Sequence, residues 1–401
     1  MENKAKKSGI EWELPIMLLI MVCGYLLIQD LLGGRLLAHS AWDSYTLQAM
    51  AWRSGMLHLP ENYPWLELAV YGAQYYVSFP PLPSVVMLPL TLIFGANTPN
   101  NLVMMLYALA TSTLCYIALR RAHTLPRMAA FTALFVVWGS NMMWMSTDGG
   151  VWFQAQALNM LLLCGALVAA QRDKRITAYA LVALAVGCRP FSAVAFIPLC
   201  AAFYLRDRRA GVSFWHAMAK QVRCLVLPAL IAGAYMWYNY ARFGNVLEFG
   251  HNYLPEFTDA QHGQFWLGYI PQNLYNIFLR PIKFVQGARL SYPLFDGFMF
   301  YIANPIFLLL FVRMIADIRH RRMDMLRVVL LASMLLELLL LCAHKTFGGW
   351  QFGARYTVDL IPLALAYMLA GGWQMKRYER LIAMLGIMLN IYGALAMTVL
   401  A

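Results

Sequence analysis

Long apolar segments separated by short basic clusters constrain this chain more than any other feature. The first segment, "LPIMLLIMVCGYLLI" at 14–28, follows a basic head that contains Lys4, Lys6 and Lys7. Hydrophobic residues make up 61% of the chain and charged residues only 12%, a balance that soluble domains do not reach. The pattern predicts an all-α protein that crosses a membrane many times. No small-residue cleavage site follows the first segment, so we expect a retained span.

The basic clusters indicate which loops share one side of the membrane. They are "KAKK" at 4–7, "RRAHTLPR" at 120–127, "QRDKR" at 171–175, "RDRR" at 206–209, "RHRRMDMLR" at 319–327 and "KRYER" at 376–380. Because cytoplasmic loops carry an excess of Lys and Arg, we predict a multi-pass plasma-membrane protein with its N-terminus inside and its C-terminus outside. The net charge of +12 then reflects topology and contact with the lipid bilayer, and nucleic acid is not an expected partner.

This assignment gives about eleven crossings of the bilayer. They are predicted at 14–32, 101–120, 127–145, 151–170, 176–188, 190–205, 222–240, 298–315, 325–343, 357–374 and 381–400. A further apolar segment at 82–94 is shorter than the about 20 residues of a full crossing, so we expect it to dip into the outer leaflet. The segment 33–100 is then one external loop. The chain divides into a transmembrane module at 1–240, a long external loop at 241–297 and C-terminal spans at 298–401.

Arg189 stands at the turn of an unusually short pair of spans, 176–188 and 190–205. Thirty helical residues reach about 45 Å in total, so neither limb fully crosses about 30 Å of hydrocarbon. The sequence therefore predicts that Arg189 lies within the depth of the membrane. A cation there faces a cavity or a partner, and the phosphate of a lipid is an anionic partner that arrives through the membrane.

Several acids lie at helix ends or inside spans. Asp43 precedes "SYTLQAMAWRSG", where it is either only the N-cap of an interfacial helix or an N-cap that also faces a cavity. Asp148 in "STDGG" is either a turn residue or a site residue on the same side as Asp43. Glu337 lies inside a predicted span, as a functional polar residue or a satisfied packing contact.

The external loops carry further candidates. Lys345, Trp350 and Arg355 fall in "HKTFGGWQFGARY", which reads either as an aromatic membrane anchor or as a ligand-binding loop. His251 and His262 in the long loop 241–297 lack metal-ligand spacing, and we interpret them as ordinary loop residues.

External carboxylates and a half-buried arginine suit one kind of chemistry. A sugar carried on a lipid phosphate is attacked by an acceptor hydroxyl, and one carboxylate removes the proton. Cations stabilise the negative charge that grows on the phosphate oxygens as the glycosyl bond breaks.

The chain resembles the GT-C superfamily of membrane glycosyltransferases, and most of all its bacterial branch of protein-mannosyltransferase-like and aminoarabinose-transferase-like enzymes. The resembling stretches run from the first span nearly to the last. They are "AWDSYTLQAMAWRSGML" around Asp43, "YYVSFPPLPSVVMLPLTLIFG", Asp148 before an inward span, "GCRP" at 187–190 and "WQFGARYTVDLIP" at 350–362.

The resemblance implies a GT-C fold with juxtamembrane helices in the first external loop. It implies that Asp43 is the catalytic base and that a polyprenyl-phosphate sugar is the donor, transferred with inversion on the outer face of the membrane. The expected substrate-binding residues are Asp148, Arg189, Lys345, Trp350, Arg355 and Tyr356. Expected acceptors are a hydroxyl of an envelope glycan, a lipid or a protein.

Two departures from the family pattern bear on the substrates. Some relatives carry an acid–Lys pair just before the Pro-Pro dipeptide, where this chain has Ser78 and Phe79. We expect Glu67 or Lys345 to supply the missing contact. The chain shows no large C-terminal soluble domain, which favours a lipid-linked glycan or an envelope polymer as acceptor.

Two other functions use similar residues. A transporter or flippase of lipid-linked sugars needs the basic cavity but no base, although the internal repeats typical of transporters are not visible here. A glycan polymerase or ligase of another fold is the second alternative. The sequence requires no cofactor, and whether a divalent metal bridges phosphate and carboxylates stays open. Replacing Asp43 with Asn should abolish sugar transfer and spare donor binding, whereas a transporter keeps its activity.

Overall fold

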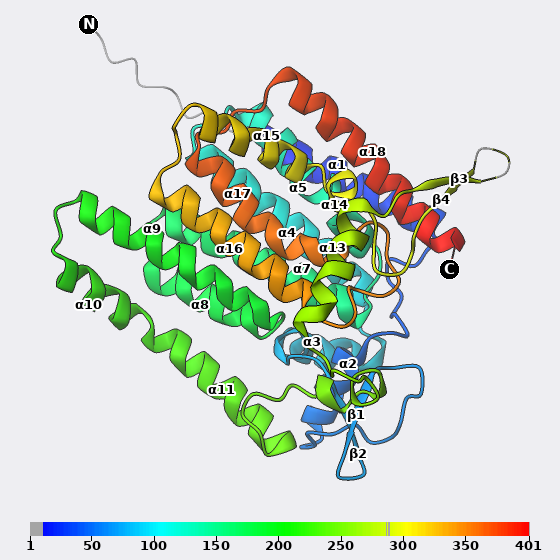
Figure 1. Cartoon of the computed structure of the whole chain (residues 1–401). Coiled ribbons are helices and arrows are strands. Elements are labelled where there is room, and N and C mark those ends of the chain that lie inside the picture. Colours follow the sequence, from blue (N-terminus) through cyan, green and yellow to red (C-terminus); the bar gives the residue numbers. More distant parts are fainter. Residues whose placement is uncertain (1–10, 286, 288, 401) are drawn as a thin grey trace, which may run out of the picture.

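The computed structural model describes residues 11–285, 287 and 289–400, and the predicted basic head at 4–7 lies outside them. Figure 1 shows a bundle of long helices with smaller elements gathered at one end. The bundle helices are α1 (Glu13–Leu31), α4 (Asn100–Arg121), α5 (Pro126–Trp138), α6 (Met142–Met145), α7 (Val151–Gln171), α8 (Arg175–Val186), α9 (Phe196–Arg209), α10 (Phe214–Cys224), α11 (Val226–Phe243), α15 (Ile306–Arg319), α16 (Met325–Cys342), α17 (Ile361–Ala370) and α18 (Arg377–Leu400).

The apolar composition of these helices makes the chain an integral membrane protein. Among the described residues, α1, α4, α7, α16 and α18 are each long and apolar enough to cross a bilayer, and α10 with α11 forms a sixth candidate bent by 41°. Other predicted spans are broken. Segment 127–145 divides into α5 and α6, and segment 190–205 begins with a 3₁₀ turn at Pro190–Ala195. The total of eleven crossings stays a prediction.

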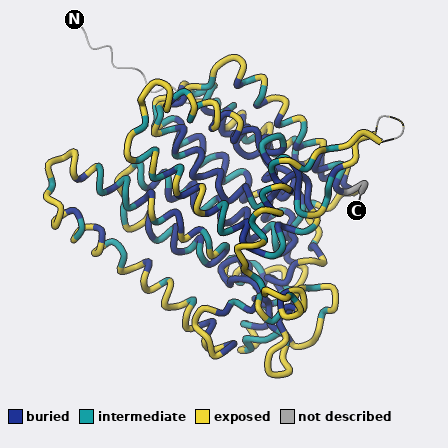
Figure 2. The backbone as a smooth tube through the Cα atoms, viewed as in Figure 1, coloured by how far each residue is buried: buried dark blue, intermediate teal, exposed yellow. Residues whose placement is uncertain are grey.

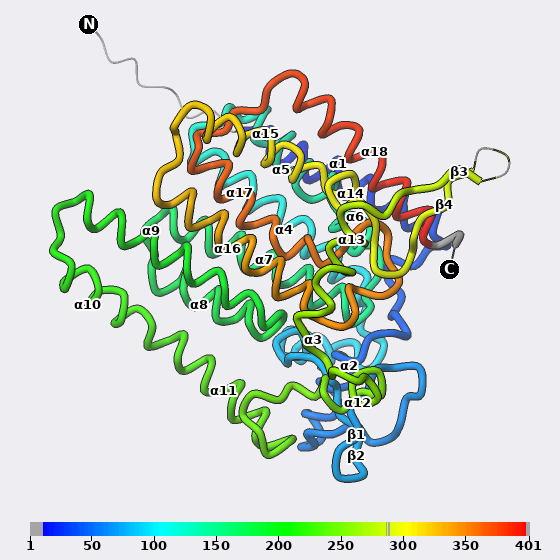
Figure 3. The backbone as a smooth tube through the Cα atoms, in the orientation of Figure 1, coloured from blue at the N-terminus to red at the C-terminus, as the bar shows by residue number. Residues whose placement is uncertain are grey.

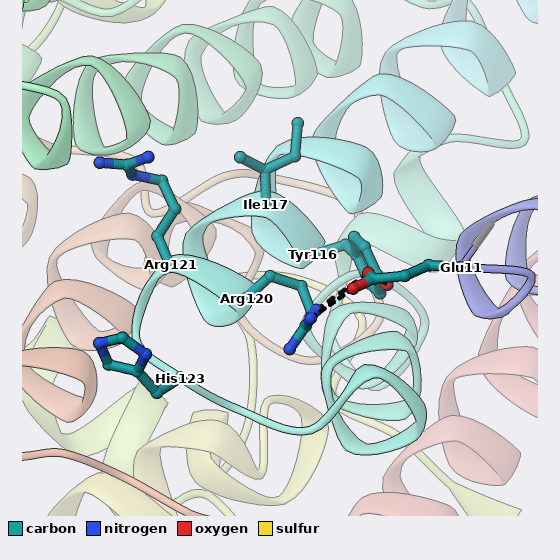
Figure 4. Close-up of a pocket in the computed structure, with 6 residues that line it drawn as sticks. All are labelled: Glu11, Tyr116, Ile117, Arg120, Arg121 and His123. Atoms are coloured by element: carbon teal, nitrogen blue, oxygen red, sulfur yellow. Dashed lines mark hydrogen bonds and ion pairs between the residues drawn. The ribbon is translucent and has the colours of Figure 1, made fainter. Parts of the chain in front are cut away.

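The basic clusters meet at one end of the bundle. Arg121 Nη2 donates to the carbonyl of Gln171 over 3.0 Å, and Arg206 Nη1 donates to Asp173 Oδ1 over 3.0 Å. A hollow of about 580 Å³ lies at this end, and in Figure 4 the Glu11 carboxylate there points toward a guanidinium of the cluster 120–127. These contacts place the clusters 120–127, 171–175 and 206–209 on the same side of the bundle, and the topology of the chain stays a prediction.

The opposite end carries the segment that follows α1. It contains α2 (Ser44–Arg53), a hairpin of β1 (Leu68–Tyr71) and β2 (Gln74–Val77), and α3 (Leu82–Phe94). At the start of helix α2, the Asp43 side chain accepts hydrogen bonds from the backbone N–H groups of Tyr45 and Thr46, so that Asp43 is the N-cap of the helix. The hairpin is antiparallel, with Leu68 opposite Val77. Helix α3 is short and contains Pro89, so the predicted interfacial helices are present in this segment.

The long loop after α11 covers the same end. Its elements are η3 (His251–Tyr253), α12 (Pro255–Thr258), η4 (Leu267–Tyr269), α13 (Ile270–Leu279), β3 (Lys283–Val285), β4 (Arg289–Ser291) and α14 (Phe300–Ala303). Isolated bridges pair Phe265 with His344 and Phe295 with Trp350. The loop therefore packs on the segment between α16 and α17, which includes η6 (Arg355–Leu360) (Figure 3).

The core lies between the central helices, whereas one edge of the bundle is exposed. Figure 2 shows mostly buried backbone through α4, α7 and α17, and mostly exposed backbone along α10 and α11. Large apolar side chains on α11, such as Leu230 and Trp237, are both 67% exposed. An exposed apolar edge of this kind suits contact with lipid.

Candidate active site

A cavity of about 1310 Å³ opens at the end of the bundle that carries α2 and the hairpin. Its walls come from the first external segment, the turn after α8, helix α11, the loop 241–297 and the loop before η6. Five of the residues predicted from sequence line it: Asp148, Arg189, Trp350, Arg355 and Tyr356. Asp43 and Lys345 lie close to its walls but do not line it.

Two arginines flank the ring of Tyr356. The guanidinium carbon of Arg189 lies 4.5 Å from the ring centroid, and that of Arg355 lies 4.9 Å from it. Two cations on one aromatic ring repel each other, and an anion bound beside them relieves that repulsion. Planar guanidinium groups match phosphate geometry, so this arginine pair is suited to hold a phosphate.

Each arginine is oriented by partners from distant helices. Arg189 Nε donates to Asp359 Oδ2 over 2.9 Å, and Asn159 Nδ2 donates to the other oxygen of Asp359 over 3.2 Å. Arg355, only 5% exposed, donates from Nη1 to Gln156 Oε1 over 2.8 Å. Sequence reasoning missed Asp359 and Gln156 as orienting groups, although Asp359 follows Arg355 within the quoted motif "WQFGARYTVDLIP".

Asp43 is fully buried and fully hydrogen-bonded. Its Oδ1 accepts from the backbone N–H groups of Tyr45 (2.9 Å) and Thr46 (3.2 Å). Its Oδ2 accepts from Thr46 Oγ1 (2.5 Å) and Asn100 Nδ2 (2.8 Å). To act as a base, this carboxylate has to release one of the two Oδ2 donors, and its catalytic role stays a prediction.

Asp148 lies on the same side as Asp43, and Asn100 connects them. Asn100 donates to Asp43 and also to the carbonyl of Gly149 over 3.1 Å. Ser40 Oγ donates to Asp148 Oδ1 over 3.0 Å, and that oxygen also accepts the Gly150 N–H over 2.7 Å. The two aspartates therefore belong to one network, in which only Asp148 reaches the cavity wall.

Trp350 and Lys345, both in the loop before η6, differ in their relation to the cavity. The Trp350 ring contacts Phe295 with centroids 5.6 Å apart and forms part of the cavity wall. The Lys345 ammonium instead donates to the backbone carbonyl of Glu256. Lys345 thus fixes the loop after α11 against this segment, and any contact with substrate requires it to leave that carbonyl.

Four cavity carboxylates lie outside the predicted set of site residues: Glu67, Glu248, Glu256 and Asp296. Glu67 Oε2 accepts from Trp152 Nε1 over 2.9 Å, and burial raises the pKa of Glu67 above its ordinary value, against the opposing charge of Arg355. Burial, and then repulsion from Glu67, raises the pKa of Glu256. A carboxyl group with a raised pKa is typical of catalytic sites, although Glu67 and Glu256 are both exposed. Glu67 appeared in the sequence only as a replacement for the missing acid–Lys pair.

In the part of the chain that the structure describes, no group of three or more His, Cys, Asp and Glu side chains is arranged to hold a metal ion. Metal dependence is therefore not assigned to any residue here.

Solved structures with the same arrangement of helices are membrane glycosyltransferases. ArnT from Cupriavidus metallidurans bound to undecaprenyl phosphate matches 94% of this chain with a TM-score of 0.55 and 15% identity. The apo oligosaccharyltransferase of Archaeoglobus fulgidus matches 99% with a TM-score of 0.55 and 16% identity. The chain has the GT-C fold. A further match, at a TM-score of 0.52 and 14% identity over 96% of this chain, is the A. fulgidus enzyme AglB with an inhibitory peptide and dolichol-phosphate.

This likeness confirms the fold class predicted from sequence. The chain spans 63% of the length of ArnT and 57% and 56% of the two oligosaccharyltransferase chains. No family model and no curated protein matches the sequence. At these identities the likeness establishes the fold, and the roles of individual residues are argued from the geometry of this chain.

Proposed function

We propose that this protein is an inverting glycosyltransferase. It moves a sugar from a polyprenyl-phosphate donor to a hydroxyl of an envelope glycan, a lipid or a protein. The observation that carries the proposal is the arginine pair on Tyr356, inside a cavity large enough for a phosphosugar. The structures of ArnT with undecaprenyl phosphate and of AglB with dolichol-phosphate support a lipid-linked partner.

The wall formed by α11 supports entry of the donor from the membrane. Tyr235, Met236 and Asn239 on this helix line the cavity, while the lipid-facing surface of α11 carries exposed apolar side chains such as Trp237. A polyprenyl chain that lies along this surface remains in an apolar environment while its phosphate reaches Arg189.

The reaction needs one proton acceptor and one stabilised leaving group. The oxygen of the acceptor hydroxyl forms a bond to the anomeric carbon as its proton passes to a carboxylate, and the bond from that carbon to the phosphate oxygen breaks. We assign the base to Asp43, whose Oδ2 exchanges the Thr46 hydroxyl for the acceptor hydroxyl. Arg189 and Arg355 stabilise the charge on the departing lipid phosphate, which leaves without being protonated.

The contacts among the basic clusters support the orientation. If these clusters are cytoplasmic, the cavity faces the periplasm or the outside of a plasma membrane. A lipid-linked glycan or envelope polymer on that side is the preferred acceptor class.

The test is consumption of the donor by the purified protein. A panel of undecaprenyl-phosphate sugars is incubated with the protein and envelope glycan acceptors, and mass spectrometry follows loss of donor and gain of glycosylated product. We expect one donor to be consumed by the wild type and not by the Asp43→Asn variant. Transbilayer movement of the donor in proteoliposomes, unchanged in Asp43→Asn and without transfer, would show a transporter instead.

A further inference from the structure

One ring nitrogen of His251 is hydrogen-bonded to the protein, and the other has no hydrogen-bond partner among the described residues. Nδ1 lies within hydrogen-bond distance of the backbone carbonyl of Ser78. A carbonyl only accepts, so Nδ1 carries the proton and Nε2 of the neutral ring presents a lone pair. Among the described residues, no group donates to this Nε2, and His251 lines the cavity.

The position of this ring is fixed by the backbone on both sides. Arg242, 3% exposed, donates to the Val77 carbonyl over 2.9 Å and to the Phe249 carbonyl over 3.4 Å. Gly250 has φ +110°, and a Cβ there would lie 3.1 Å from Ser78 Cα. Only glycine suits both that conformation and that close approach. The loop that carries His251 is therefore clamped to the end of β2.

Aromatic neighbours hold the ring itself. The centroid of Phe79 lies 4.9 Å from the His251 ring, edge to face, and Phe257 stacks on it at 5.9 Å. His344, the other histidine of the cavity wall, differs in its bonding. Its Nδ1 faces the Thr346 carbonyl at 2.7 Å, and its Nε2 lies 3.0 Å from Gln264 Nε2. Both nitrogens of His344 are satisfied by the protein, so of the two histidines in this cavity wall it is His251 that is able to bind a ligand.

The charge state of His251 decides what Nε2 can bind. Burial lowers the pKa of His251 to about 4, and the nearby Arg189 charge acts in the same direction, while the Ser78 hydrogen bond and Glu248 oppose it. The ring is thus neutral near pH 7, and Nε2 accepts hydrogen bonds and does not donate them. A phosphate oxygen has no proton to offer at that pH, whereas a sugar hydroxyl has one.

We propose that His251 Nε2 accepts a hydrogen bond from one hydroxyl of the donor sugar and makes the site selective for sugars that present this hydroxyl. The inference rests on the proposed function, because the arginine pair places the phosphate, and hence the sugar bonded to it, in the cavity that His251 lines. A bound donor that lacks the hydroxyl covers Nε2 without pairing it, which a site built around a hydrogen bond strongly disfavours. His251 acts as a specificity-determining residue.

The experiment measures binding of undecaprenyl phosphate and its glucosyl, mannosyl and galactosyl derivatives to the purified protein in detergent by native mass spectrometry. The derivative that binds best is compared with each of its monodeoxy analogues. We expect one analogue to bind about tenfold more weakly than its parent, the size of one lost hydrogen bond. In His251→Asn, whose amide retains the donor to Ser78 and lacks the Nε2 position, parent and analogue should bind equally. In His251→Gln, whose amide oxygen reaches that position, the discrimination should persist.

The controls separate a failed inference from a failed function. His262→Asn changes an exposed histidine that stacks on Trp266 at 3.9 Å, outside the cavity wall, and should leave every ratio unchanged. Equal binding of all analogues by the wild type, or the same deoxy penalty in His251→Asn as in the wild type, overturns the inference. Failure of the wild type to bind undecaprenyl phosphate and all of its derivatives overturns the proposed function itself.

Discussion

Exchanging Asp43 and Asn100 separates the structural role of this aspartate from its catalytic role. In Asp43→Asn, the backbone N–H groups of Tyr45 and Thr46 keep their acceptor. An amide replaces Oδ2, however, and then faces the Asn100 amide at the present 2.8 Å separation. Two donors cannot bond to each other, so one charge-assisted hydrogen bond is lost, at about 1.5–3 kcal/mol. We expect a loss of about 2–3 kcal/mol in unfolding free energy.

The double variant Asp43→Asn with Asn100→Asp restores the match, because the amide at 43 now donates to a carboxylate at 100. Recovery should be partial, since Asn100 also donates to the Gly149 carbonyl and Asp cannot. Asp43→Ala is the reference for complete loss, with about 1 kcal/mol added for the missing cap. Thermal unfolding of each purified variant in detergent, followed by tryptophan fluorescence, gives the order of stability.

Sugar transfer is then measured in the same preparations. If Asp43 is the base, the double variant regains stability while transfer stays reduced about 10²–10⁴-fold, the usual size of general-base catalysis. Recovery of transfer together with stability would refute the assignment and leave Asp43 as a helix cap. Equal stability of Asp43→Asn and the wild type would refute the hydrogen-bond reasoning.

Three further outcomes are expected. Arg189→Ala should weaken binding of undecaprenyl phosphate at least tenfold in a direct binding assay, the equivalent of about 1.4 kcal/mol. Arg206→Ala, at the opposite end of the bundle, should leave the affinity unchanged. Equal affinity of the two variants counts against the phosphate site. Asp359→Asn should lower the unfolding free energy by about 3 kcal/mol, because it removes one member of a buried ion pair, and a thermal unfolding curve identical to that of the wild type would contradict this. Burial lowers the pKa values of His251 and His344 from 6.5 to about 4 and about 3. The stability that these neutral rings contribute is therefore complete above about pH 6.5 and is lost as pH falls toward 4. In unfolding curves from pH 8 to pH 4, His251→Asn should reduce this loss of stability at acid pH, and an unchanged pH dependence would refute its origin in His251.

The fold class could be predicted because its determinants are local. Apolar runs of helical length require helices in a bilayer, and the apolar run with a central proline at 82–94 is shorter than a full crossing needs. Asp43 could be predicted as an N-cap because its partners Tyr45 and Thr46 are two and three residues away. The short turn that holds Arg189 was likewise visible from segment length alone.

The contacts that make the cavity join residues far apart in the chain. Arg189 meets Asp359 across 170 residues and His251 meets Ser78 across 173, and no local pattern marks either pair. His251 was interpreted as an ordinary loop residue because its spacing from His262 carries no signal. Asp43 was expected to face the cavity, yet Asn100 from α4 completes its hydrogen bonds and keeps it within the wall.

By itself, the sequence determined that the chain forms membrane helices and which ends of them carry cations, since hydrophobicity and charge are read over a few residues. The tertiary structure alone decided which polar atoms are satisfied within the protein and which are left for a ligand. That outcome depends on which side chains the packed helices and loops bring within about 3 Å of one another, and such distances are set only when the whole chain has folded.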